Sequence, residues 1–127
     1  MLIRIDFESD TPIYAQLRDQ VVIGIADGSL EKGEALPSVR RMAADIGVHA
    51  HTVNKSYAML RDEGYITMDR RSGCHVRTEP QLPDEGFQAA LERKLVPLAA
   101  EAACHSLSAE GFGAMCAQIL ARLEGSA

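Results

Sequence analysis

The fold is decided by residues 38–64, which read SVRRMAADIGVHAHTVNKSYAMLRDEG. This stretch predicts two short helices: Ser38 can cap the first, which ends at Gly47, and the second runs from about Ala50 to Glu63. Apolar residues at helical spacing give each helix one buried face; they are Val39, Met42, Ala43 and Ile46 in the first and Val53, Tyr57 and Leu60 in the second. Two short helices joined by a tight glycine-containing turn are typical of a helix-turn-helix.

A longer helix is predicted before this stretch, from about residue 12 to 27. Thr11 can cap it, and Pro12 fits its first position, where the missing N–H would be unpaired. Its apolar stripe is Tyr14, Leu17, Val21 and Ile25. Residues 2–7, LIRIDF, alternate apolar and polar side chains and predict a short strand, and residues 33–38 predict a turn.

Two strand-like pieces, residues 65–68 and 74–77, follow the helix-turn-helix. Between them lies Asp69-Arg70-Arg71-Ser72-Gly73, a polar and basic turn. This pattern predicts a β-hairpin with a basic tip, which is the wing of a winged helix-turn-helix.

The chain beyond the hairpin predicts a helical tail. Pro80 and Pro83 mark a linker, and two amphipathic helices follow; Pro97 is expected to kink or split the first, and Ser108 to cap the second. We therefore expect a mainly α protein with a small β wing. Residues 1–78 would form a winged helix-turn-helix, residues 79–83 a linker and residues 84–127 a two-helix dimerisation tail.

Composition and charge predict a small globular protein with one basic segment. The chain has 127 residues, 46% of them hydrophobic, and no apolar run long enough to cross a membrane. The first residues show no apolar signal core, and three cysteines at irregular spacing do not make a disulfide framework, so we expect a cytoplasmic protein. The net charge is −5, but residues 40–78 carry +3 and the segments on either side −4 each. The excess positive charge lies in the helix-turn-helix and wing.

The second helix of a helix-turn-helix enters the major groove of DNA with its N-terminal residues facing the base edges. Its apolar stripe faces the core, which leaves an exposed set near its start: His49, His51, Thr52, Asn54 and Lys55. Asparagine pairs with adenine, threonine offers a hydroxyl and a methyl, and lysine reaches guanine or phosphate. Arg40 and Arg41 on the preceding helix, and Arg70 and Arg71 in the wing, are placed to meet phosphates or the minor groove.

Short motifs at fixed spacing extend this pattern along residues 2–77. They are Pro12-Ile13-Tyr14, Gly33-Glu34-x-Leu36-Pro37-Ser38-x-Arg40, Gly47-Val48, Thr52-Val53, Leu60, Gly64-Tyr65-Ile66, and Gly73 with Val76. In these motifs the chain resembles the winged helix-turn-helix of the GntR superfamily of bacterial regulators. The resemblance implies that Ser38, Arg40, Thr52 and the wing around Gly73 contact DNA, and we add His75 in the same wing strand as a candidate.

The short tail is similar to that of the YtrA-like subfamily, in which such a tail serves for dimerisation. The amphipathic pattern of the two helices also favours a dimer. So small a protein cannot bury both apolar faces by itself, and a second subunit would cover them. The candidate dimerisation residues are Phe87, Leu91, Leu95, Leu98, Phe112, Met115, Ile119, Leu120 and Leu123. We therefore expect a homodimeric DNA-binding transcriptional regulator, a repressor in preference to an activator, bound to an inverted-repeat operator.

Three departures from the family pattern affect the DNA preference and not the fold. His49-Ala50-His51 stands where the family more often has a Ser or Asn cap, and histidine is a poor N-cap. Cys74-His75 occupies a place where a small residue and an aromatic one are usual, and Ser56 stands where alanine is common.

Other classes of function find less support in the residues. No nucleophile elbow, phosphate-binding glycine loop or HExxH motif is present, so we expect no catalytic residues, no enzyme activity and no cofactor. The four histidines and three cysteines lack metal-ligand spacing, and we expect no metal site. Cys104 and Cys116 lie in apolar stripes and are expected to be buried, with Cys74 exposed. The alternative is a winged-helix protein-interaction module without DNA binding; a small-molecule effector stays open.

Overall fold

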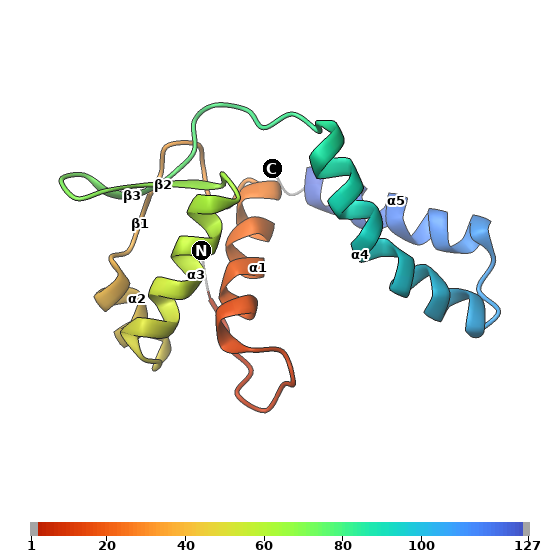
Figure 1. Ribbon diagram of the computed structural model, residues 1–127, viewed down its shortest axis with the longest axis horizontal. Helices are drawn as coiled ribbons and strands as arrows, with labels where there is room; N and C mark the ends of the chain where they lie inside the picture. The colour runs from red at the N-terminus through yellow and green to blue at the C-terminus, as the bar shows by residue number, and fades with distance from the viewer. Residues whose placement is uncertain (1–2, 126–127) are drawn as a thin grey trace. The chain divides into compact units, whose positions relative to one another are not determined.

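The computed structural model of the chain describes residues 3–125 (Figure 1). In chain order the elements are α1 (Ile13–Ala26), β1 (Ala35–Leu36), α2 (Val39–Ile46), α3 (Ala50–Asp62), β2 (Ile66–Asp69), β3 (Gly73–Val76), α4 (Glu85–Cys104) and α5 (Ala109–Gly125). The described chain divides into two compact units. One comprises the described residues up to Glu79 together with Glu124 and Gly125, and the other runs from Pro80 to Leu123. The fold is mainly α with a small antiparallel sheet, which confirms the expected fold class.

Helix α3 lies at the centre of the first unit, where it packs against α1, α2 and β2 (Figure 1). Its apolar stripe is buried as the spacing predicts, with Val53, Tyr57 and Leu60 fully excluded from solvent. The other helices and the sheet close this core with Leu17, Val21, Leu30, Leu36, Met42, Ala43, Ile66 and Val76. The core therefore fixes which face of α3 turns outward.

The helix-turn-helix forms at the positions that its capping residues predict. The Ser38 hydroxyl accepts a hydrogen bond from the Arg41 N–H (3.2 Å) at the start of α2. Gly47 ends α2 in the left-handed conformation, with φ +73°, and its N–H donates to the Ala43 carbonyl. The buried Tyr57 hydroxyl donates to the Pro37 carbonyl (2.8 Å), which ties α3 to the turn before α2.

The sheet has the strand order β1-β3-β2 with antiparallel pairing. Strands β2 and β3 form the expected wing, and the pair Ile66–Val76 closes the core beneath it. Gly73 begins β3 with φ +83°, a conformation that suits glycine at a tight hairpin. Strand β1 was not predicted, because its two residues lie within the expected turn and become a strand through pairing with Cys74 and His75.

The strand expected over residues 2–7 does not form within the described residues 3–7. Two glutamines of α1 take the place of a partner strand. Gln20 accepts from the Arg4 N–H (2.8 Å) and donates to the Arg4 carbonyl, and Gln16 pairs in the same way with Asp6 (2.9 Å for both bonds). Since these side chains are one helical turn apart, they satisfy the backbone of alternate residues. Pro12 is the N-cap residue of α1, so Thr11 does not cap the helix.

The second unit consists of α4 and most of α5, which are joined by a short turn (Figure 1). The Asp84 carboxylate caps α4 through the Phe87 N–H (2.8 Å), and Ser108 caps α5 as predicted, accepting from the Gly111 N–H (3.0 Å). Helix α4 continues through Pro97, so the predicted split is wrong. No residue of α4 is buried, and solvent can therefore satisfy the Arg93 carbonyl that Pro97 leaves without its helical N–H partner.

The expected exposure of the cysteines is also wrong. Cys104 is exposed at the end of α4, Cys116 is half-buried, and Cys74 is half-buried. Cys74 pairs with Leu36 and Met68 across the sheet and packs against the core. Burial raises the pKa of its thiol above the usual value, which lowers its reactivity.

Candidate nucleic-acid interface

The face of α3 that points away from the core carries most of the predicted reading residues. His51, Asn54 and Lys55 are exposed there, and Thr52 is half-buried at the edge of the face. His49 is the N-cap residue of α3, and its side chain makes no capping hydrogen bond. The backbone compensates, because the His49 carbonyl accepts from the Thr52 N–H at 3.0 Å. The prediction that histidine is a poor cap here is confirmed.

Helix α2 adds the second part of the interface. Arg40 and Arg41 are both exposed, and Arg41 makes an ion pair of 3.8 Å with Asp45 one turn later. Both partners of this pair are exposed, so the pair is weak and leaves Arg41 able to reach a phosphate. The Ser38 hydroxyl caps the N-terminus of α2, and the residue is exposed there.

The tip of the wing forms the third part. Arg70 and Arg71 are exposed in the turn between β2 and β3, and the Arg71 N–H donates to the Asp69 carboxylate (2.8 Å), which orders the turn. His75 lies away from this tip, opposite Thr67 and Ala35 in the middle of the sheet. Because side chains alternate along a strand, His75 points away from the core-facing Val76 and lines a groove of about 700 Å³ with Arg61 and Arg77. His75 thus lies on the face of the sheet that points away from the core, and not at the tip of the wing.

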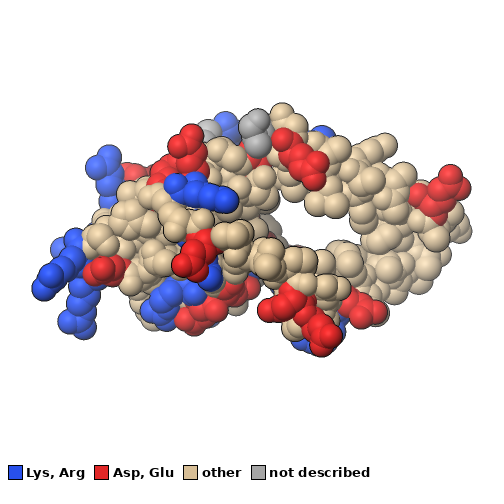
Figure 2. Space-filling view, turned by 90° about the horizontal axis from the view of Figure 1, so that it is seen from above, with Lys and Arg blue, Asp and Glu red and all other residues tan. Residues whose placement is uncertain are grey.

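Charge on the first unit follows this arrangement. Figure 2 shows Lys and Arg side chains gathered at the end of the unit where Figure 1 places the tip of the β2–β3 hairpin, with acidic side chains among and behind them. The first turn of α3 contains no acidic residue. A phosphate backbone that approached this end would meet cations from α2 and from the wing.

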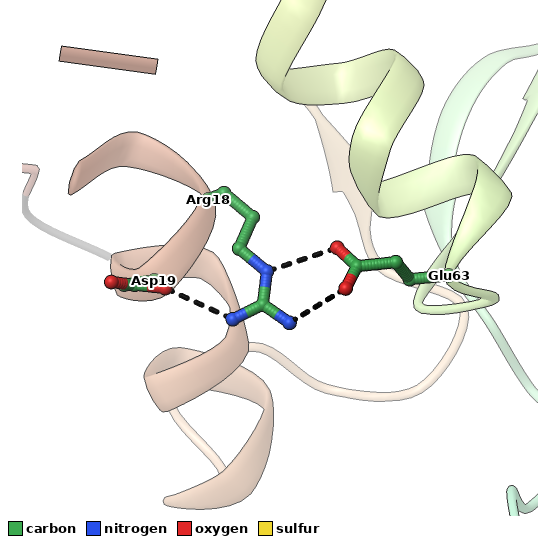
Figure 3. A network of polar contacts seen from close by, with 3 residues as sticks. All are labelled: Arg18, Asp19 and Glu63. Atoms are coloured by element: carbon green, nitrogen blue, oxygen red, sulfur yellow. Dashed lines mark hydrogen bonds and ion pairs between the residues drawn. The ribbon is translucent and has the colours of Figure 1, made fainter. Parts of the chain in front are cut away.

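Two contacts that sequence patterns did not predict hold α3 in place. Figure 3 shows the first: the Arg18 guanidinium of α1 binds both carboxylate oxygens of Glu63, at 3.0 Å each, and Asp19 at 2.9 Å. The hydrogen bond with Glu63 is the main cause that raises the pKa of Arg18 above its usual value, and partial burial opposes it. The same guanidinium lies 5.5 Å from the centre of the Tyr65 ring. Arg18 therefore links α1 to the end of α3 and to the residue before the wing.

The second contact involves a predicted DNA-binding residue. The Lys55 ammonium lies over the Tyr14 ring of α1, 3.9 Å from the ring centre. Neither contact has a local signal in the sequence, because the partners come from helices that the tertiary fold brings together.

No group of three or more His, Cys, Asp and Glu side chains is placed to hold a metal ion among residues 3–125. In the same range, none of the helices combines the length and the apolar character that a bilayer crossing requires.

The helix-turn-helix, the wing and their exposed basic residues together define a winged helix-turn-helix protein of the class that binds duplex DNA. The family model described as bacterial regulatory proteins, gntR family, matches residues 13–76, from the start of α1 to the end of β3. The chain belongs to this family and is a DNA-binding transcriptional regulator.

Two curated relatives illustrate the match. The helix-turn-helix-type transcriptional regulator Rv1152 of Mycobacterium tuberculosis is 32% identical over 97 residues, which cover 76% of this chain and 78% of that protein. The helix-turn-helix-type transcriptional repressor YtrA of Bacillus subtilis is 39% identical over 75 residues, 59% of this chain. That alignment spans 58% of YtrA.

The likeness in structure extends into the tail. A solved structure described as a transcriptional antiterminator from Listeria monocytogenes matches with a TM-score of 0.85, over 94% of this chain and 90% of that chain. The identity is 23%, and the match therefore describes the fold, including helices after the wing.

Proposed function

We propose that the protein is a homodimeric repressor that binds an inverted-repeat operator. In each subunit the exposed face of α3 would enter the major groove, and the tip of the wing would reach the adjacent minor groove. The proposed DNA contacts are Ser38, Arg40, Arg41, His49, His51, Thr52, Asn54, Lys55, Arg70, Arg71 and Gly73. We leave out His75, since it lies in the middle of the sheet and away from the tip of the wing.

One observation carries the proposal. A single rigid core turns the polar face of α3 outward and places exposed arginines on α2 and at the wing tip of the same unit. Candidate base-reading side chains and candidate phosphate-binding arginines thus belong to the same unit. Specific protein–DNA interfaces combine both kinds of contact. Repression needs nothing more than occupation of promoter DNA. The similarity to YtrA, which is described as a repressor, supports that direction of regulation.

A homodimer is supported by the second unit. Most apolar residues of α4 and α5 are exposed in the described chain, although Phe112 and Leu123 are half-buried. Phe87, Leu98, Met115 and Leu120 are each close to half exposed or more. Exposed apolar surface of this extent marks an interaction site, and a second copy of the same two helices is a self-complementary cover. Two-fold symmetry then requires two equivalent half-sites in the operator.

The test is DNA binding by the full chain to a duplex obtained by site selection from genomic DNA. We expect selected sites to contain an inverted repeat, bound with an affinity that falls steeply as salt rises. Arg40→Ala should weaken binding to every sequence and reduce the salt dependence, whereas Asn54→Ala should change the preferred base at one position of each half-site.

Lys32→Ala is the matched control for charge, because Lys32 is exposed in the turn before β1 and outside the proposed interface. It should leave affinity and site preference unchanged. Failure of the wild-type chain to bind any duplex at low salt would contradict DNA binding and favour a protein-interaction module. Selection of sites without two-fold symmetry would contradict the homodimer on an inverted repeat.

A further inference from the structure

Lys55 is an exposed residue of the recognition helix whose charged end already has a partner in the protein. Its ammonium lies 3.9 Å from the centre of the Tyr14 ring, and Tyr14 is the second residue of α1. No ion pair of the described residues involves Lys55. The aromatic ring is thus the contact that determines where this cation lies.

Lys55 and Asn54 lie toward opposite flanks of the exposed face of α3. The helix buries Val53, Ser56, Tyr57 and Leu60, and at about 100° per residue this places His51, Asn54 and Lys55 on the opposite side. Asn54 lies toward the flank of α3 that carries the Tyr57 contact with Pro37, next to α2. Lys55 lies toward the other flank, and its stem carries the ammonium further, onto α1. Figure 1 shows α3 between α2 and α1, in agreement with these contacts.

A helix in the major groove has a phosphate backbone on each of its flanks, while its central face meets the base edges. On the α2 flank, Arg40 and Arg41 are exposed and available to one backbone. On the α1 flank, the described unit presents Lys55 on the Tyr14 ring. The ring occupies one side of the ammonium, and the N–H donors on the other side remain available to a phosphate oxygen.

We propose that Tyr14 is a positioning residue for DNA binding, and that it holds Lys55 at a phosphate on the α1 flank of the recognition helix. Lys55 then contributes to affinity and to its salt dependence, and it does not select a base. The ring restricts a flexible lysine stem before DNA arrives, so less freedom is lost on binding. This inference rests on the proposed mode of DNA binding.

The first measurement is the affinity of Lys55→Ala for the selected operator as a function of salt. We expect affinity to fall by about five- to tenfold at moderate salt, and the slope of log K against log [salt] to become shallower by about 0.9 per bound subunit, as for the loss of one phosphate contact. The preferred base at every position should stay the same. Lys55→Arg, which keeps a cation able to stack on the ring, should retain the wild-type slope.

The second measurement is a double-mutant cycle between the two residues. Tyr14→Phe keeps the ring and should bind as the wild type does, whereas Tyr14→Leu should lose about two- to fivefold in affinity. In the Lys55→Ala background, Tyr14→Leu should have no further effect on DNA binding, because the residue that it positions is gone. A merely structural role of Tyr14 would weaken binding equally in both backgrounds. Thermal unfolding of each variant checks that the fold is retained.

Three outcomes would overturn the inference. They are a change of base preference in Lys55→Ala, a salt slope equal to that of the wild type in Lys55→Ala, and an undiminished effect of Tyr14→Leu in the Lys55→Ala background. Each leaves the proposed function standing, because wild-type binding to the operator is measured in the same series. Absence of wild-type binding would overturn both the function and this inference.

Discussion

Ser56 is a polar residue on the buried face of α3, whose other buried residues belong to the hydrophobic core. It is completely buried in α3, and its hydroxyl is the buried side-chain oxygen that lacks a hydrogen-bond partner among the described residues. An unpaired hydroxyl in the core costs about 1–3 kcal/mol of desolvation. Ser56→Ala should therefore stabilise the protein by about 1 kcal/mol, measured as a higher midpoint of urea unfolding.

Ser38→Ala is the matched comparison, because it removes the same hydroxyl where the hydroxyl has a partner. Ser38 caps α2 through the Arg41 N–H. Its replacement should destabilise the protein by about 1 kcal/mol. Both variants remove a serine hydroxyl, and we expect the free energy of unfolding to rise in Ser56→Ala and to fall in Ser38→Ala. A loss of stability in Ser56→Ala would mean that its hydroxyl has a partner in solution.

Tyr57 makes stability depend on pH in the alkaline range. Burial, the main cause, raises the pKa of its phenol above the usual value of about 10, with a smaller contribution from Cys74. A raised pKa in the folded state means that the unfolded chain loses the phenolic proton first. The stabilisation is complete below pH 10 and declines as pH rises above it.

The variant that isolates this effect is Tyr57→Phe. At pH 7 it should be less stable than the wild type by about 1 kcal/mol, because the hydrogen bond to Pro37 is lost. As pH rises from 9 to 11, the wild type should lose more free energy of unfolding than the variant, so the difference should shrink. Urea unfolding at several pH values measures this difference in the free energy of unfolding. A difference that stays constant over this range would contradict the assignment of the pH dependence to Tyr57.

At the scale of elements, the start of α3 is the least well capped helix end of the helix-turn-helix. His49 adopts the extended backbone of an N-cap residue, with φ −72° and ψ 143°, but its side chain accepts no hydrogen bond. His49→Ser should supply the missing acceptor and stabilise the protein by about 0.5–1 kcal/mol. Thermal unfolding checks this, with His49→Ala as the control that removes the imidazole without supplying an acceptor. Equal stability of His49→Ser and the wild type would show that the backbone contact with Thr52 already suffices.

Helices were predictable from the sequence where apolar spacing and capping residues agreed. Ser38, Gly47 and Ser108 act at the helix ends that they predict. The prediction of an N-terminal strand was wrong because alternating side chains do not indicate which groups pair with the backbone. In this structure two glutamines of α1 pair with it. Strand β1 is too short to carry any periodicity and exists only through its pairing with β3.

The candidate interface was predictable to the same extent. Exposure of Asn54, Arg40 and the wing arginines follows from the apolar stripes, since they lie outside them. The contact of Lys55 with Tyr14 and that of Arg18 with Glu63 join helices through the tertiary fold, and no local pattern encodes them. The place of His75 was not predictable from the motif either. Its position in β3 turns its side chain away from the core, in the middle of the sheet.

At the scale of the whole molecule, charge and apolar surface are divided between the two units. The excess of basic residues lies within residues 40–78, in the first unit, while the tail is acidic and exposes its apolar residues. This division favours a molecule in which one unit binds DNA and the other binds its copy. An acidic tail is a poor partner for phosphates.

The exposed apolar residues of the tail predict that the protein assembles through α4 and α5. Leu120 is 60% exposed on α5, and Leu120→Glu places a charge in the proposed dimer contact without removing a buried residue. We expect the wild type to sediment with twice the mass of one 13.8 kDa chain, and the variant to sediment as a monomer. Its operator affinity should fall by at least tenfold, because the second half-site no longer gains from the first. Leu82→Glu is the control, since Leu82 is 78% exposed in the linker before α4 and should leave the dimer intact. A monomeric wild type at micromolar concentration would overturn the homodimer, and a dimeric Leu120→Glu would place the contact on another part of the chain.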